Sequence, residues 1–224
     1  MIFFKGLSSD FLDTFLAIIA LLSALFVAIP FHEFAHAYAA KKQGDYTAVA
    51  YKRCTPAALV HFDLAGFMLM IFFGFGWAKP VPVDPRNFKH GKKSEFLVSI
   101  AGIVMNLILG IVFLFIYMLI IKVDVNFFVN SYYGVLLFYF LRYSFLLNFG
   151  LAIFNLLPIY PLDGYNIIKS FCKYDNGYLR FARTYSMILF IIIIISGVYA
   201  VYYDYVIEKL LTLFINLFGK ILGL

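Results

Sequence analysis

Hydrophobic residues fall in a few long runs, and short basic stretches separate these runs. Four runs approach or exceed the ~20 residues with which an α-helix crosses a bilayer, namely residues 11–43, 94–121, 134–157 and 184–203. Ser9 or Asp10 suits the N-cap of the first helix, and Gly44 with Asp45 suits its end. The tail, residues 206–224, carries polar residues at mostly helical spacing, and either lies in the interface or returns across the membrane.

Residues 44–93 break this pattern. Residues 46–60 are predicted as short strands, and the apolar run 64–77 is only fourteen residues long with three glycines. A run of that length favours a re-entrant segment over a full crossing. Three prolines within residues 78–85 then force an extended chain, because proline fixes φ and restricts the residue before it.

Composition supports a membrane protein and argues against other classes. The 224 residues are 64% hydrophobic and only 13% charged, about half the ~25% usual in soluble domains. The net charge of +6 does not indicate a nucleic-acid partner, because the basic residues lie between the apolar runs as topology signals. The two cysteines are isolated, so neither a thiolate metal site nor a disulfide framework is indicated. We expect one domain embedded in the lipid bilayer over residues 1–224, with a core at about 11–170 and C-terminal helices at about 184–224.

The first apolar run contains the sequence His32-Glu33-Phe34-Ala35-His36. On an α-helix the two histidines lie one turn apart on one face, so both imidazoles can reach one metal ion, with Glu33 beside them. The alternative is a chance match, or two histidines satisfied by neighbouring helices. Ionisable residues within a membrane segment favour a functional site.

A third metal ligand is expected, since zinc hydrolases usually hold the ion with three protein ligands and leave one position for water. Asp163 is a better candidate than His61 or His90, because the third apolar run breaks at Pro158 and Pro161 and places this carboxylate just past its end. Ordinary turn chemistry is the alternative for this aspartate, and His61 is an alternative ligand.

Three motifs together resemble the site-2 protease family, the intramembrane zinc metalloproteases of peptidase family M50. They are residues 32–36, the Gly-Trp-Ala-Lys-Pro-Val-Pro-Val sequence at 76–83, and residues 155–164. The resemblance implies one zinc ion bound by His32, His36 and Asp163, Glu33 as catalytic base, and Asn155 at the active site. It also implies a substrate that is a transmembrane segment of another protein. A subsidiary match at 101–106 departs from the family pattern by having Ile103 in place of proline.

The implied ligand set constrains the topology. His36 and Asp163 share a metal only if their helix ends lie at one membrane face, so residues 44–93 must leave and return on one side. The expected fold is therefore all-α and polytopic, with about four to six membrane helices and a re-entrant or extended segment near the site. Thirteen of the 18 Lys and Arg residues then share that side, which the positive-inside rule makes cytoplasmic: Lys41, Lys42, Lys52, Arg53, Lys79, Arg86, Lys89, Lys92, Lys93, Lys169, Lys173, Arg180 and Arg183.

Several alternatives stay open at this point. A membrane transporter or metal-binding protein using the same ionisable cluster would share these residues, as would an inactive protease-like scaffold. Asn155 either contacts the substrate or makes an interhelical hydrogen bond. The extended segment with Val81 and Val83 is a candidate for pairing with an unwound substrate by strand addition. The oligomeric state is open.

Overall fold

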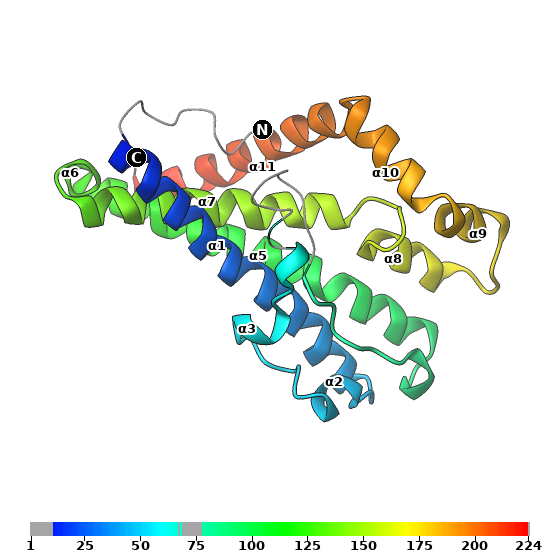
Figure 1. Cartoon of the computed structure of the whole chain (residues 1–224). Helices are drawn as coiled ribbons and strands as arrows, with labels where there is room; N and C mark the ends of the chain where they lie inside the picture. Colours follow the sequence, from blue (N-terminus) through cyan, green and yellow to red (C-terminus); the bar gives the residue numbers. More distant parts are fainter. Residues whose placement is uncertain (1–10, 67, 69–77, 224) are drawn as a thin grey trace.

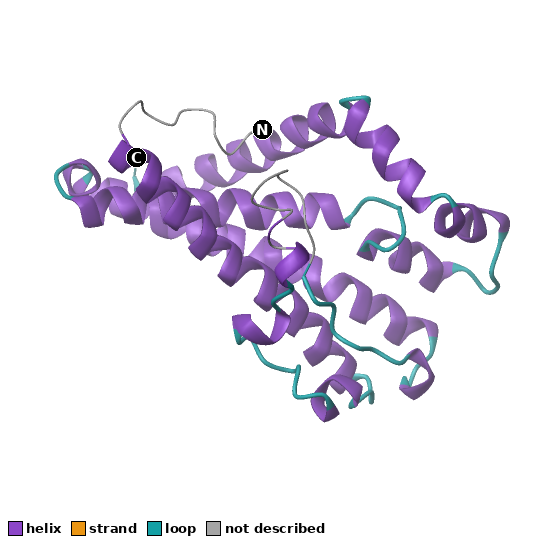
Figure 2. Ribbon diagram, viewed as in Figure 1, coloured by secondary structure: helices purple, strands orange, loops and turns teal. Residues whose placement is uncertain are grey.

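The structure is a computed structural model that describes residues 11–66, 68 and 78–223, and every regular element in these ranges is helical (Figures 1 and 2). In chain order the elements are α1 (Phe11–Lys42), α2 (Thr47–Ala50), α3 (Ala58–His61), the 3₁₀ helix η1 (Pro85–Asn87), α5 (Lys92–Asp124), α6 (Asn126–Val129), α7 (Tyr132–Asn155), α8 (Asp163–Phe171), α9 (Gly177–Thr184), α10 (Ser186–Ile195) and α11 (Val198–Leu222).

Helices α1, α5 and α7 form the centre of the molecule and are long and apolar enough to cross a membrane (Figure 1). Small buried residues on α1, Ala17, Ala20 and Ala24, let this helix approach Tyr143 and Leu147 of α7 closely, as is usual for helices that pack in a bilayer. The predicted all-α polytopic fold is confirmed, and the protein is a multi-pass membrane protein.

The fourth predicted span, residues 184–203, is wrong as a single helix. The chain bends between α10 and α11, where Gly197 has a φ of 70°, and the segments Ser186–Ile193 and Val198–Leu222 meet at 69°. Glycine adopts this left-handed conformation without the steric cost of a side chain. The bent pair can act as a fourth span. The tail continues α11, whose Ile207 and Phe218 pack against buried residues of α5 and α7.

The predicted end of α1 is confirmed by its backbone hydrogen bonds. The Asp45 N–H donates to the Ala40 carbonyl at 3.0 Å, and the Gly44 N–H donates to the Lys41 carbonyl at 3.1 Å. Gly44 has a φ of 102°. This is the Schellman arrangement, which needs a left-handed residue just past the helix end. The expected N-caps, Ser9 and Asp10, lie outside the described residues.

The strands predicted within residues 46–60 are wrong, since this stretch contains the short helices α2 and α3. Its neighbour in space is the extended segment 78–84, which we call the strap. The strap is extended, as its prolines predict. The same prolines interrupt strand pairing with residues 46–60, because they lack the N–H groups that a β-ladder requires. One backbone hydrogen bond joins the two stretches, from the Lys79 N–H to the His61 carbonyl at 2.9 Å. Most of the predicted re-entrant run, residues 67 and 69–77, lies outside the described residues.

A buried carboxylate holds the strap to the end of α1. Asp45 is fully buried and accepts hydrogen bonds from the Thr47 N–H at 3.0 Å, the Asn87 amide at 3.0 Å and the Asp84 N–H at 2.8 Å. Burial by itself raises the pKa of Asp45, but the hydrogen bonds from Thr47, Asn87 and Asp84 outweigh it and hold the pKa below its usual range. The ionised form is therefore the one that the fold stabilises.

We expect Asp45→Asn to destabilise the protein by about 1–3 kcal/mol at neutral pH, because an amide N–H would face donors that now bind a carboxylate. Since the folded pKa is depressed, the contribution of Asp45 is present above the unfolded value near 3.9 and is lost as pH falls through the folded pKa. Melting temperatures in detergent between pH 3 and pH 7 measure this. The exposed Asp175, paired with Arg183, provides the control Asp175→Asn, and an equal effect of both variants would contradict the prediction.

Candidate metal centre

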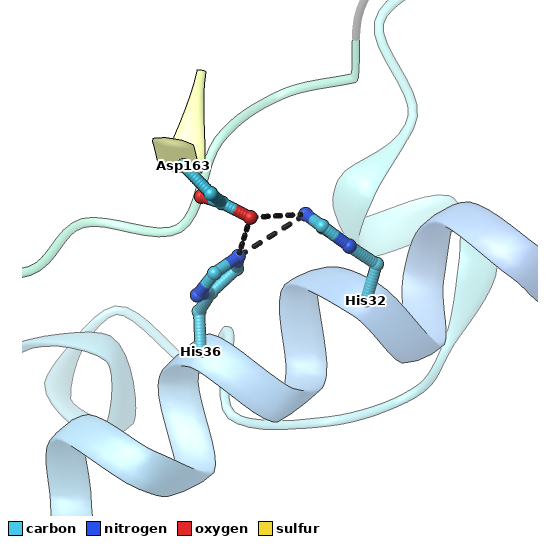
Figure 3. Close-up of side chains that lie close together, drawn as sticks. All are labelled: His32, His36 and Asp163. Atoms are coloured by element: carbon cyan, nitrogen blue, oxygen red, sulfur yellow. Dashed lines mark hydrogen bonds and ion pairs between the residues drawn. The ribbon is translucent and has the colours of Figure 1, made fainter. Parts of the chain in front are cut away.

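Three side chains converge in the C-terminal half of α1 (Figure 3). His32 and His36 project from one face of α1, and their Nε2 atoms lie 3.1 Å apart. The Asp163 Oδ2 atom lies 3.4 Å from His32 Nε2 and 3.2 Å from His36 Nε2. Among the described His, Cys, Asp and Glu residues, these three have ligand atoms close enough together, within 4.8 Å of one another, to hold one metal ion.

The outer nitrogens of both histidines are already engaged. His32 Nδ1 donates to the Asn106 side-chain oxygen, and His36 Nδ1 donates to the Val98 carbonyl, each at 2.8 Å. Both partners are acceptors, so in the neutral imidazole the proton lies on Nδ1 and Nε2 presents a lone pair to a metal ion. Such outer partners orient imidazole ligands at metal sites.

The inner atoms therefore fit a cation. Two imidazole nitrogens and one carboxylate oxygen face one another at 3.1–3.4 Å. Within the described ranges, Asp163 Oδ2 is buried and has no hydrogen-bond partner. A buried acceptor left without a partner is costly, and two nitrogens with one oxygen are a usual zinc donor set. The residues present fit zinc.

The turn after α7 determines where Asp163 lies. A Cβ on Gly164 would lie 2.4 Å from the carbonyl oxygens of Leu156 and Leu157, so the chain folds back this tightly only with glycine. Helix α8 is then held against α5 by the ion pair from Lys169 to Glu95 at 2.7 Å. The first residue of α8, Asp163, thus reaches the α1 histidines from the same end of the bundle, as the topology argument predicts.

The close approach of α5 to α1 depends on Gly102, whose role was not predicted. A Cβ at this position would lie 2.3 Å from His36 Nε2 and 2.5 Å from His32 Cε1. Gly102 lies one helical turn before Asn106, within the motif at 101–106. The sequence feature that indicates Gly102 is this motif, in which a small residue and a polar residue share one face of an apolar helix.

We expect Gly102→Ala to lower zinc affinity by about 10–100-fold, since the added methyl group must displace both imidazoles from their outer partners. Metal content after dialysis against buffered zinc measures this. The matched control is Gly110→Ala on the same helix, where the new Cβ meets the Phe149 ring at 2.6 Å. The control should lower the melting temperature and keep zinc; full zinc occupancy in Gly102→Ala would contradict the prediction.

Glu33 lies beside the cluster and contacts the strap. The Val81 N–H donates to Glu33 Oε2 at 2.8 Å. This hydrogen bond brings together the motifs at 32–36 and 76–83, which are far apart in the sequence. One carboxylate oxygen of Glu33 is thus fixed by the backbone of the strap.

The hydrogen bonds of the two remaining candidates, Asn155 and His61, go to partners outside the three-residue cluster. Asn155 is the last residue of α7, and its amide donates to the Leu151 carbonyl at 3.0 Å within its own helix. His61 is buried, its Nε2 lies 2.8 Å from the Thr55 carbonyl, and it is not part of the three-residue cluster. The structure therefore favours Asp163 over His61 beside the two histidines.

Comparisons with known proteins give a consistent picture. The sequence model of peptidase family M50 matches residues 20–196. The chain is 37% identical over 177 residues to YwhC of Bacillus subtilis, described as a candidate zinc metalloprotease, covering 79% of this chain and 80% of that protein. It is 30% identical over 156 residues to the zinc metalloprotease MJ0392 of Methanocaldococcus jannaschii, covering 70% of this chain but 35% of the relative. No solved structure matches the chain significantly.

Proposed function

The chain belongs to peptidase family M50 and is a zinc metalloprotease, and from this premise we propose that it cleaves a peptide bond in or near a transmembrane segment of another membrane protein. The observation that carries the proposal is the position of the metal-binding cluster. His32 and His36 lie on α1, a helix fit to cross a membrane. His36 precedes Lys41 by five residues, or roughly 8 Å along the helix.

In this proposal His32 Nε2, His36 Nε2 and Asp163 Oδ2 hold one zinc ion. When bound, zinc lowers the pKa of a coordinated water and polarises the scissile carbonyl. Glu33 accepts the proton of the attacking water and passes it to the leaving amine nitrogen. Because the Val81 N–H binds Oε2, Glu33 Oε1 is the oxygen available for proton transfer.

Asn155 is proposed to donate a hydrogen bond to the substrate backbone or to the developing oxyanion. Its position supports this role, since it ends α7 directly before the turn that carries Asp163. One N–H of the Asn155 amide donates to the Leu151 carbonyl, and the amide has a second N–H that can donate to the substrate.

The substrate helix must unwind before attack, because a helix hides its peptide bonds in its own hydrogen bonds. Few backbone groups of the strap are available to pair with a substrate strand, since Pro80 and Pro82 have no N–H and the Val81 N–H is bound to Glu33. The Val81 carbonyl and the Val83 N–H make no hydrogen bond within the described residues, and we propose these as the groups that meet an unwound substrate strand.

We propose that the site faces the cytoplasm. The support is the positive-inside rule, applied to the thirteen Lys and Arg residues that the proposed topology puts on the same side of the membrane as the site. Several of them belong to contacts at that end, including Lys92 and Lys169 with Glu95.

The test uses the purified full-length protein in proteoliposomes with tagged single-span membrane proteins. We expect a fragment whose new terminus lies in or beside the span, loss of cleavage with 1,10-phenanthroline, and recovery after zinc is added back. An unfolded soluble protein such as casein serves as the comparison substrate. Cleavage of casein without cleavage of any single-span protein would overturn the membrane substrate and leave the zinc protease intact.

A further inference from the structure

The Arg53 side chain, between α2 and α3, binds the strap at the point nearest Glu33. Its guanidinium donates from Nη1 to the Pro80 carbonyl at 2.6 Å and from Nη2 to the carbonyls of Lys79 and Val60, each at 3.1 Å. A planar guanidinium offers five N–H groups in a fixed fork. Two successive strap carbonyls are therefore held in a defined orientation.

One of these carbonyls belongs to the same peptide unit as the amide that binds Glu33. The Pro80 carbonyl and the Val81 N–H form a single trans peptide group, and such a group is planar, with its C=O and N–H pointing in opposite directions. Arg53 holds the oxygen of this plane, and Glu33 Oε2 accepts from its N–H at 2.8 Å. The peptide plane rigidly connects the guanidinium to the carboxylate.

The neighbouring residues restrict this plane further. Pro80 and Pro82 have restricted φ angles and no N–H, so Val81 supplies the backbone donor of residues 80–82. Upstream, the Lys79 N–H is bound to the His61 carbonyl at 2.9 Å. Rotation of the Pro80–Val81 peptide away from Glu33 would break the short Arg53 contact.

We propose that Arg53 is a positioning residue for Glu33. It orients the Pro80–Val81 peptide so that the Val81 N–H holds Oε2 and leaves Oε1 free to accept a proton. This inference rests on the proposed function, in which Glu33 is the catalytic base. It gives the strap a role in holding the base, in addition to meeting the substrate.

The kinetic test compares Arg53→Ala and Arg53→Lys with wild type in proteoliposomes. We expect kcat to fall about 10–100-fold, as for a small misplacement of a catalytic group, with KM within about twofold and zinc content unchanged. Free guanidinium should restore part of the kcat of Arg53→Ala at concentrations that leave wild type unaffected, whereas sodium chloride should not. The matched control is Arg86→Ala, since Arg86 is exposed and pairs with Asp84 at the far end of the strap.

The second readout does not depend on turnover. Because Val81 carries the one exchangeable amide of residues 80–82, hydrogen exchange of fragments covering them reports the Val81–Glu33 hydrogen bond directly. We expect Val81 to exchange about tenfold faster in Arg53→Ala and in Glu33→Ala than in wild type. Arg86→Ala should leave its exchange unchanged.

Each failure is distinguishable. If wild type cleaves no membrane substrate, the proposed function fails, while hydrogen exchange still tests the connection from Arg53 to Glu33. If wild type is active, the positioning role is overturned by a raised KM with unchanged kcat, by loss of zinc or melting temperature together with kcat, or by a Val81 amide that stays protected in Arg53→Ala.

Discussion

Replacing Glu33 with glutamine should slow peptide hydrolysis by about 10²–10⁴-fold and leave zinc bound. Glutamine has the shape of glutamate and can still accept the Val81 N–H that now binds Oε2, but its amide cannot take a proton from water. Glu33 is not one of the three side chains that converge as metal ligands. Initial cleavage rates of a single-span substrate and zinc content by mass spectrometry measure the two effects.

The matched control for this prediction is Glu208→Gln, an exposed glutamate on α11, which should retain wild-type cleavage. Loss of zinc in Glu33→Gln would instead make Glu33 a ligand. Unchanged cleavage would place the base elsewhere. A protein that only transports metal or acts as a scaffold would show no difference between wild type and Glu33→Gln in peptide turnover.

Replacing Asp163 with asparagine should lower zinc affinity by more than about 100-fold and abolish cleavage at ordinary zinc concentrations. Loss of a partner in the outer shell already costs about 10–100-fold, and a direct ligand contributes more. The variant replaces a charged oxygen that lies 3.2 Å and 3.4 Å from the two histidine nitrogens. Competition for zinc against a fluorescent chelator measures the change in affinity.

Zinc should raise the melting temperature of wild type but not of Asp163→Asn, because only a ligand that binds the folded state stabilises it. Asp204→Asn, on the exposed side of α11, is the control and should respond to zinc as wild type does. Wild-type affinity in Asp163→Asn would mean that another side chain completes the site.

Much of the fold follows from local patterns. The apolar runs predict α1, α5 and α7, the glycine at 44 predicts the end of α1, and the prolines predict the extended strap. The errors arise where local signals are weak. Residues 46–60 have a strand-like composition but contain short helices, and the strap beside them cannot continue a β-ladder because Pro80 and Pro82 have no N–H. The isoleucine-rich run after residue 184 is interrupted by Gly197, which an apolar count does not detect.

Some residues of the candidate site also follow from local patterns, whereas others do not. His32, Glu33 and His36 are placed together by helical periodicity alone. Asp163 is identified from the chain break at Pro158 and Pro161 together with the family resemblance, since it lies more than a hundred residues away. The partners that orient the imidazoles, Asn106 and the Val98 carbonyl, become visible only when α5 packs against α1.

The sequence by itself therefore determines the membrane class, the long helices and the pairing of His32 with His36, because these depend on neighbours within one or two helical turns. Only the tertiary structure decides how closely α5 approaches α1 at Gly102 and which peptide plane holds Glu33. Such contacts join residues 48 to 74 positions apart, and their geometry is set by helix packing and by the fixed planes of the peptide group and the guanidinium.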